Sequence, residues 1–267
     1  MSAQDATQER PQDWKNYEDF AAGIDTNRLP PSTALTDRKV RVTFAHRAPL
    51  VLAFAAGQVT WSDSDGAGTD SCDVVEVGAA TYFVDIAFVS RPKEALTLIL
   101  DLATRRALAV RSVILEPGER PGEPRVAQEF VPGVIEDATR PVTSIEPGPT
   151  RDLIGLRAHF TYSPQHVYEH TYLSSQRYCW QNLVGVQRGH GDVDMATTYK
   201  FAENQYVFTF REFLIPVASV FFYNFETMRS TGKFLGITAD GRVENSKAGA
   251  RIRKVSMTYY LPGEEPV

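Results

Sequence analysis

The sequence predicts an all-β chain folded as two tandem antiparallel meander barrels behind a short N-terminal arm. Helical periodicity is mostly absent after residue 34, and short runs rich in Val, Phe, Tyr and Thr recur between clusters of Gly, Asp, Asn and Pro. The same order of motifs then returns in the second half of the chain. A closed barrel of about seven or eight strands in each half would remove exposed sheet edges and could leave a cavity for one small ligand.

Residues 1–34 are expected to form the arm, with a short helix within Asp13–Ala22 that Leu29-Pro30-Pro31 ends. The first barrel is expected at 35–116, a linker rich in Pro, Gly and acidic residues at 117–149, and the second barrel, with the functional site, at 150–267. The expected strands of the first half are 38–45, 49–55, 58–62, 73–77, 81–88, 95–101 and 107–115. Those of the second half are 156–162, 167–173, 177–184, 193–201, 205–212, 217–225, 231–237 and 250–260.

The two halves are similar enough to predict a duplication. Short anchors occur in the same order, at an offset that drifts only as small loop insertions would cause. They are Arg41 and Phe44 with Arg157 and Phe160, Trp61 with Trp180, Tyr82 with Tyr206, Asp101 with Asn224, and Arg106 with Arg229. The alternative is a chance match between weak β-patterns. The counterpart of Glu212 falls near Phe88, so the first barrel is expected to be mainly structural.

Composition and charge exclude several classes of function. A net charge of −5 disfavours nucleic acid as a partner, and no apolar run approaches the roughly 20 residues of a membrane span. The N-terminus lacks the basic-then-apolar order of a signal peptide, which predicts a cytoplasmic protein. Cys72 and Cys179 are then expected to be free thiols, with a disulfide between them as the alternative. The oligomeric state stays open, a homodimer included.

The most informative stretch runs from Tyr162 to Glu212, where tyrosines, a tryptophan and histidines alternate through strand-like segments. Because alternate residues of a strand share a face, Phe210 and Glu212 are expected to point into one interior. A carboxylate in such apolar surroundings would have a raised pKa and could act as a general acid or base. The alternative is a carboxylate at a strand end, paired with Arg211 or another neighbour.

Alternation assigns the remaining candidates to the same interior. The predicted contacts to a small flat ligand are Phe160, Tyr162, Tyr168, His170, Tyr172, Trp180 and Phe210. The alternative for each is a tyrosine-rich core whose hydroxyls reach the rim. Arg188 lies in a glycine-punctuated turn, where it could hold an anionic group of the ligand or could be a solvated turn residue.

No metal and no cofactor are expected. His190, Asp192 and Asp194 occur close together, but their spacing fits no metal-binding motif. The chain also has no Gly-rich phosphate loop, no GxSxG elbow and no paired CxxC.

The second half contains the motifs Leu153-Ile154-Gly155-Leu156-Arg157, Tyr168-Glu169-His170-x-Tyr172-Leu173, Tyr178-x-Trp180 and Phe210-Arg211-Glu212. These motifs resemble those of the MoaF family, named molybdenum cofactor biosynthesis protein F. The first half, with Trp61 and Leu100-Asp101-Leu102, is similar to that family's N-terminal domain. The resemblance implies two calycin-like, or lipocalin-like, barrels.

The second half more distantly resembles phenolic acid decarboxylases, which are also small calycin barrels. The similarity begins at IGLRAHFTYSPQHVYE and spans only part of that half. It implies that Phe160 and Tyr162 lie near the carboxyl end of a substrate, with Arg188 and Glu212 deeper. Phe160 stands where that family has a tyrosine, so decarboxylation itself does not follow.

Three functions remain open. The first is an enzyme without metal or redox cofactor, of the lyase, hydratase or isomerase type. It would act on a small aromatic or phenolic substrate, with Glu212 moving the proton and Tyr162 and Arg188 assisting. The second is a non-catalytic lipocalin-like binding or accessory protein, linked through the resemblance to molybdenum cofactor biosynthesis. The third is a structural or interaction role with no ligand.

Overall fold

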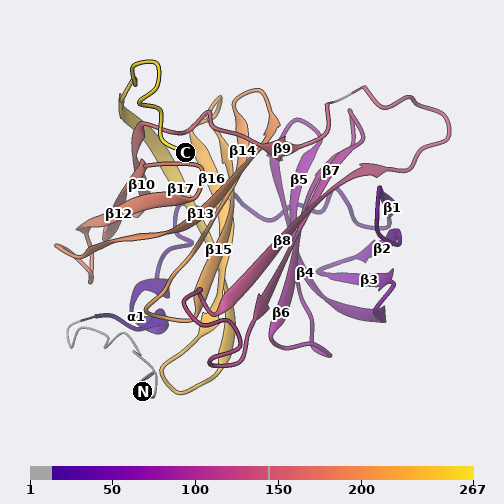
Figure 1. Cartoon of the computed structure of the whole chain (residues 1–267). Coiled ribbons are helices and arrows are strands. Elements are labelled where there is room, and N and C mark those ends of the chain that lie inside the picture. Colours follow the sequence, from indigo (N-terminus) through magenta and orange to yellow (C-terminus); the bar gives the residue numbers. More distant parts are fainter. Residues whose placement is uncertain (1–13, 144) are drawn as a thin grey trace, which may run out of the picture.

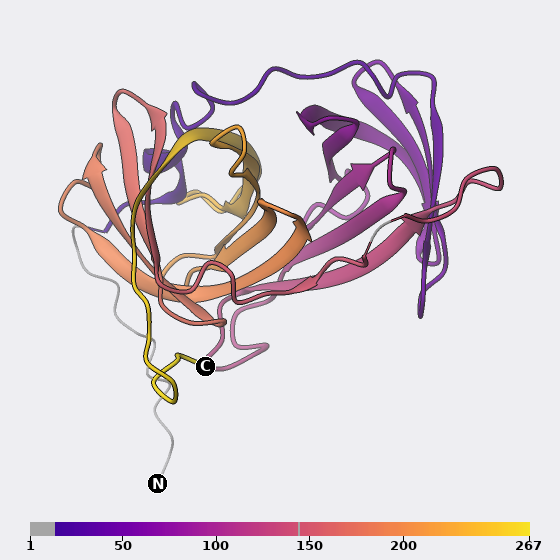
Figure 2. The same cartoon turned by 90° about the horizontal axis from the view of Figure 1, so that it is seen from above.

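The computed structural model describes residues 14–143 and 145–267, and it confirms the predicted fold class of two antiparallel barrels with a short helical arm. The two barrels lie side by side, as Figures 1 and 2 show. Helix α1 spans Tyr17–Ala21. No helix among the described residues is long and apolar enough to cross a membrane.

The first barrel is a closed meander of eight strands, each paired with its neighbour in sequence and the last with the first. Its strands are β1 Lys39–Phe44, β2 Leu50–Ala55, β3 Gln58–Asp63, β4 Gly66–Gly78, β5 Thr81–Ala87, β6 Glu94–Asp101, β7 Arg106–Ile114 and β8 Val126–Ile135. Its interior is filled mainly by Val, Leu and Ile side chains, such as Val42, Leu52 and Leu98.

The second barrel repeats this order. Its strands are β10 Leu156–Ser163, β11 His166–Tyr172, β12 Arg177–Val184, β13 Gly191–Ala202, β14 Gln205–Arg211, β15 Val217–Asn224, β16 Arg229–Ile237 and β17 Val243–Met257. Pairing of β10 with β17 and of β12 with β13 completes the circle, and the short strand β9, Gly148–Pro149, adds to β13. Its interior is filled mainly by aromatic rings.

Residues 126–135 correct the expectation of a strandless linker at 117–149. They form β8, which pairs with β7 and β1 and closes the first barrel. Pro132 and Gly133 disguise this strand in the sequence. Pro132 has no backbone N–H to donate to a neighbouring strand. It is tolerated because only residues 133–135 of β8 pair with β1, so no hydrogen bond to β1 is lost at residue 132. Gly133 is required because a Cβ there would lie 2.8 Å from the Phe44 ring.

The anchors of the predicted repeat lie on corresponding strands of the two barrels. Trp61 on β3 donates its indole N–H to Asp70 Oδ2 at 2.7 Å, and Trp180 on β12 donates to Asp194 Oδ2 at 2.9 Å. The ends of β6 and β15 also match, because a side-chain oxygen of Asp101 or Asn224 accepts the backbone N–H groups two and three residues later. These shared hydrogen bonds support a duplication.

The two barrels pack against one another through the outer faces of β4–β7 and β13–β15. The apolar residues of this contact are Val75, Val77, Phe83, Ile99, Leu108, Val110, Phe201, Val207, Val220 and Phe222. A buried ion pair crosses it, with Lys233 Nζ 2.8 Å from Asp85 Oδ1. Thr97 and Asn245 donate further hydrogen bonds to the Asp85 carboxylate. Burial lowers the pKa of Lys233, and the attraction of Asp85 opposes that shift.

The N-terminal arm packs on the second barrel before the chain enters the first one, as the top view in Figure 2 shows. Tyr17 and Phe20 of α1, with Ile24 after it, are buried in the core of the second barrel. The arm then pairs with strand edges, since Asn27 N–H donates to Tyr162 O and Gly249 N–H donates to Ile24 O. The second barrel is therefore completed by residues from the opposite end of the chain.

We predict that Lys233→Met lowers the free energy of unfolding by about 3–5 kcal/mol, because it leaves the Asp85 carboxylate buried without its cation. Urea denaturation measures the loss. The double variant Lys233→Met, Asp85→Asn is expected to recover at least half of it. A double variant no more stable than the single one would show that the loss comes from packing and not from an unpaired charge.

Candidate functional site

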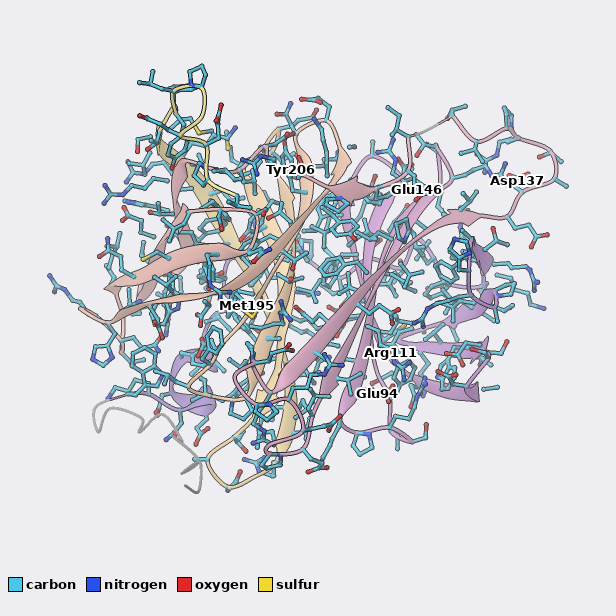
Figure 3. The ribbon with its side chains drawn as sticks, in the orientation of Figure 1. Glu94, Arg111, Asp137, Glu146, Met195 and Tyr206 are labelled. Atoms are coloured by element: carbon cyan, nitrogen blue, oxygen red, sulfur yellow. The ribbon has the colours of Figure 1, made fainter. Side chains whose placement is uncertain are left out.

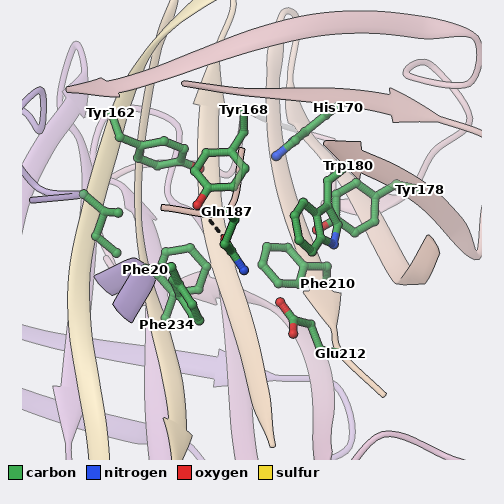
Figure 4. A pocket seen from close by; sticks show the side chains of 11 residues that line it. Phe20, Tyr162, Tyr168, His170, Tyr178, Trp180, Gln187, Phe210, Glu212 and Phe234 are labelled. Carbon is green, nitrogen blue, oxygen red and sulfur yellow. Dashed lines mark hydrogen bonds between the residues drawn. The ribbon is translucent and has the colours of Figure 1, made fainter. Parts of the chain in front are cut away.

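A ring-lined cavity lies at one end of the interior of the second barrel (Figure 4). Its lining comes from β10, β11, β12, β14 and β16, from the turn after β12 and from the N-terminal arm. The lining residues are Phe20, Ile24, Tyr162, Tyr168, His170, Tyr178, Trp180, Gln187, Phe210, Glu212 and Phe234. The cavity volume is about 40 Å³, well below the roughly 150 Å³ of an engineered apolar cavity that binds benzene. It is therefore too small for an aromatic ligand as it stands.

Strand alternation predicts much of this lining. Of the predicted residues, the structure brings Tyr162, Tyr168, His170, Trp180, Phe210 and Glu212 to the cavity. Phe160 and Tyr172 are instead buried behind it and do not line it. The His170 ring stacks on Phe160, with 4.3 Å between the ring centroids, so Phe160 packs against a residue that lines the cavity.

The structure places Arg188 in the turn after β12, away from the predicted contact with a ligand. Its side chain is exposed and does not reach the cavity, while the neighbouring Gln187 is buried and lines it. Gly185 and Gly189 both have positive φ, at 140° and 91°, so strand alternation does not continue through this turn. Gln187 Oε1 accepts a 2.7 Å hydrogen bond from the Tyr168 hydroxyl, drawn as a dashed line in Figure 4.

Apart from Gln187, the lining residues that the sequence did not predict fall into two groups. Tyr178 and Phe234 lie on barrel strands, and alternation with Trp180 is a sufficient signal for Tyr178. Phe20 and Ile24 belong to the arm, and no local pattern shows that the arm returns to the second barrel. The part of the lining that the arm supplies could therefore not be predicted from the sequence.

Burial keeps the lining tyrosines and histidine uncharged near neutral pH. Desolvation lowers the pKa of His170 to about 3, which makes the imidazole neutral. Desolvation also raises the phenol pKa of Tyr162, Tyr168 and Tyr178 far above its usual value. The cavity thus presents neutral hydroxyl donors among apolar ring faces.

Glu212 contributes the carboxylate of the lining. It directly follows β14, its backbone N–H donates to Val217 O at 3.0 Å, and only 8% of its surface is exposed. In Figure 4 its carboxylate lies beside Phe210, across from the arm. Its negative charge further raises the phenol pKa of Tyr168 and of Tyr178, so it is electrostatically coupled to both hydroxyls.

Asp194 fixes the position of Trp180 from outside the cavity. Its side chain is fully buried, and its Oδ2 accepts the indole N–H of Trp180. Desolvation raises the Asp194 pKa to about 7, while the hydrogen bonds from Trp180 and from the Phe213 backbone oppose that shift. The Phe213 contact also ties Asp194 to the residue that follows Glu212.

The same arrangement in the first barrel identifies the counterpart of Glu212. Asp70 accepts the Trp61 indole and the Val89 backbone N–H, as Asp194 does with Trp180 and Phe213. The residue before Val89 is Phe88, which confirms the alignment of Phe88 with Glu212. The carboxylate is therefore specific to the second barrel.

The corresponding mouth of the first barrel is ionic. A cavity of about 70 Å³ there is bordered by the charged groups Arg47, Asp63, Asp65, Arg91 and Arg111. Arg111 Nη2 lies 2.8 Å from Glu94 Oε2, and both residues are labelled in Figure 3. The Arg91 guanidinium stacks 4.0 Å from the Phe88 ring centroid. The charges at this mouth neutralise one another, in contrast to the ring-lined cavity of the second barrel.

Two family models match the chain. The MoaF N-terminal domain matches residues 12–116, and the MoaF C-terminal domain matches residues 147–258. Protein MoaF from Klebsiella aerogenes is 32% identical over 188 residues, which cover 66% of this chain and 70% of that protein.

Two solved structures show only low similarity to this chain. A candidate β-lactamase from Burkholderia vietnamiensis gives a TM-score of 0.35 at 14% identity, covering 40% of this chain and 100% of that one. The β chain of DNA polymerase III from Streptococcus pneumoniae gives a TM-score of 0.15 at 7% identity, covering 90% and 84%. Neither likeness carries an argument about fold or function.

We predict that Asp194→Asn removes a pH dependence of stability. The Asp194 pKa is about 7 in the folded chain and near 4 in the unfolded chain, so the folded chain holds the extra proton between these values. Stability from this group is full below pH 4 and is lost as the pH rises towards 7. The free energy of unfolding of the variant, relative to that of the wild type, should therefore rise by roughly 1.4 kcal/mol per pH unit over that window. Above the window the difference should stay constant. Parallel stability curves from urea unfolding at pH 4.5, 6 and 7.5 would contradict this role.

Proposed function

The chain belongs to the MoaF family, and we propose that its second barrel binds a small aromatic molecule that carries no negative charge. The names of the family and of the matched relative state no ligand. The proposal therefore depends on the chemistry of the cavity.

The observation that carries the proposal is a cavity walled by rings with a few converging polar groups. Tyr168 is edge-on to Tyr162, with an interplanar angle of 84°, and tilted at 60° to Trp180. Such offset and edge-on arrangements also suit an additional ring between them. A mostly apolar pocket with a few placed hydroxyl, amide and carboxylate groups is typical of a site for a small organic ligand.

The charges of the lining determine which ligands fit. Among the described residues of the lining none is basic apart from His170, which burial keeps neutral, and Glu212 is a carboxylate. An anionic ligand would lose its hydration and face a like charge in a low-dielectric site. The exposed position of Arg188 removes the group expected to hold a substrate carboxylate. We therefore propose a neutral ring compound, such as a phenol or an aromatic alcohol or ketone, and not a phenolic acid.

A pair of nearly isosteric ligands tests this proposal. Benzyl alcohol is expected to bind at least about tenfold more tightly than benzoate, a difference of about 1.4 kcal/mol, in calorimetric titrations at pH 7.5. Trp180→Leu should abolish binding of benzyl alcohol, whereas Trp61→Leu, the same change in the first barrel, should leave it in place. Tighter binding of benzoate, or equal loss in both variants, would contradict the proposed site.

Proton transfer by Glu212 is a second proposal for the same cavity. Glu212 lies among the rings that would hold the ligand and is coupled to the Tyr168 and Tyr178 hydroxyls. A carboxylate beside neutral hydroxyl donors can accept a proton while the hydroxyls stabilise the developing oxyanion. The matching chemistry is of the lyase, hydratase or isomerase type.

Hydrogen exchange from a neutral aromatic ketone tests the catalytic proposal. Wild-type protein is expected to exchange the benzylic CH₂ protons of phenylacetone with D₂O faster than buffer does, as followed by NMR. Glu212→Gln should slow this exchange by about 10²–10⁴-fold while ligand affinity stays within about threefold, since the amide keeps the shape but is not a base. Equal loss of exchange and affinity would instead indicate a structural carboxylate.

The non-catalytic alternative uses the same cavity as a carrier site. It is supported by the apolar rings of the lining, which suit storage of a ligand as well as reaction. Ligand binding without exchange above the buffer rate would favour this alternative. The link to molybdenum cofactor biosynthesis stays a prediction from the family resemblance.

A further inference from the structure

We infer that residues 14–23 of the N-terminal arm form a lid, which must lift before a ligand can enter the second barrel. The inference rests on the proposed function and adds the route by which the ligand reaches the cavity. It also makes the arm part of the site, because Phe20 lines the cavity directly.

The size of the cavity requires a moving wall. A volume of about 40 Å³ cannot hold an aromatic ring, so some part of the lining must move on binding. The strand walls are held by the hydrogen bonds of a closed barrel, from β10 through β17. The turn that carries Gln187 has its own backbone bonds, including Asn182 N–H to His190 O and Gly189 N–H to Asn182 O. The arm is the wall with the fewest backbone bonds to the barrel.

Side chains hold the lid in place. Tyr17 donates its hydroxyl to Phe234 O at 2.8 Å and accepts from Ser246 N–H at 3.1 Å, which places its phenol between β16 and β17. Phe20 packs edge-on against Phe234, with 5.5 Å between ring centroids. The Trp14 ring lies 5.9 Å from those of Trp180 and His190, so the start of the lid rests on the cavity rim.

The chain after residue 23 is anchored differently and provides the fixed end of a hinge. Gly249 N–H donates to Ile24 O, and Asn27 bonds β10 through both its backbone and its side chain. Arg229 Nη2 donates to Asn27 O at 2.6 Å. Gly23 lies between the two parts with φ +81°, a left-handed conformation that glycine adopts without strain. Rotation about Gly23 would lift α1 without disturbing this anchor.

A lid of this kind controls the uptake of ligand. Only the fraction of molecules with the arm lifted can take up ligand, so the association rate scales with that fraction. The seated arm leaves no room for a ring, so the apparent affinity scales with the same fraction. Weaker docking of the lid therefore raises the association rate and lowers the apparent dissociation constant.

Tyr17 is the residue to change, because it holds the lid but does not line the cavity. We expect Tyr17→Ala to raise the association rate of 2-naphthol, a neutral fluorescent aromatic, by about tenfold in stopped-flow mixing with the full chain. Tyr17→Phe keeps the ring and loses only the hydroxyl, so its increase should be smaller. Tyr199→Ala, which removes a tyrosine packed on Phe130 between the barrels, is the matched control and should leave the rate unchanged.

Hydrogen–deuterium exchange of the backbone amides in 14–23 reports the lid without any ligand. It should quicken in the order wild type, Tyr17→Phe, Tyr17→Ala, in parallel with the association rate. Faster exchange with unchanged association would overturn the lid. Unchanged exchange and association would overturn it as well, because Tyr17 would then not hold the arm. If exchange quickens but 2-naphthol binds none of the proteins, the proposed function fails and the lid admits no ligand.

Discussion

Closure of eight antiparallel strands places alternate side chains of every strand in one enclosed space, and the rest of this structure depends on how that space is filled. The first barrel fills it mainly with Val, Leu and Ile, which pack into a continuous core. The second fills it with rings, which meet edge-on or tilted and line a cavity at one end. The ring lining of this cavity is thus a consequence of which side chains occupy the same architecture.

A shared tryptophan–carboxylate hydrogen bond shows where the two copies differ. Trp61 with Asp70, and Trp180 with Asp194, fix the same point of each barrel, next to Phe88 in the first and Glu212 in the second. One copy thus has a ring where the other has a carboxylate.

Local patterns in the sequence account for most of the fold and for part of the candidate site. Alternation identifies Tyr162 and Tyr168 because a strand repeats every two residues regardless of its partners. It fails at Arg188, because two glycines with positive φ end the alternation in that turn. It misses β8 because Pro132 and Gly133 look like loop residues, and it misses Phe20 because docking of the arm is a contact between distant parts of the chain.

We propose that the ring-lined end of the second barrel is a binding site for a neutral aromatic molecule. A crystal structure of the full chain grown with saturating p-cresol would show whether the site is occupied. We expect density for one ring between Tyr168, Phe210 and Phe20, with the arm displaced from its present position around it. Density at the ionic mouth of the first barrel, or an empty second barrel at saturation, would contradict it.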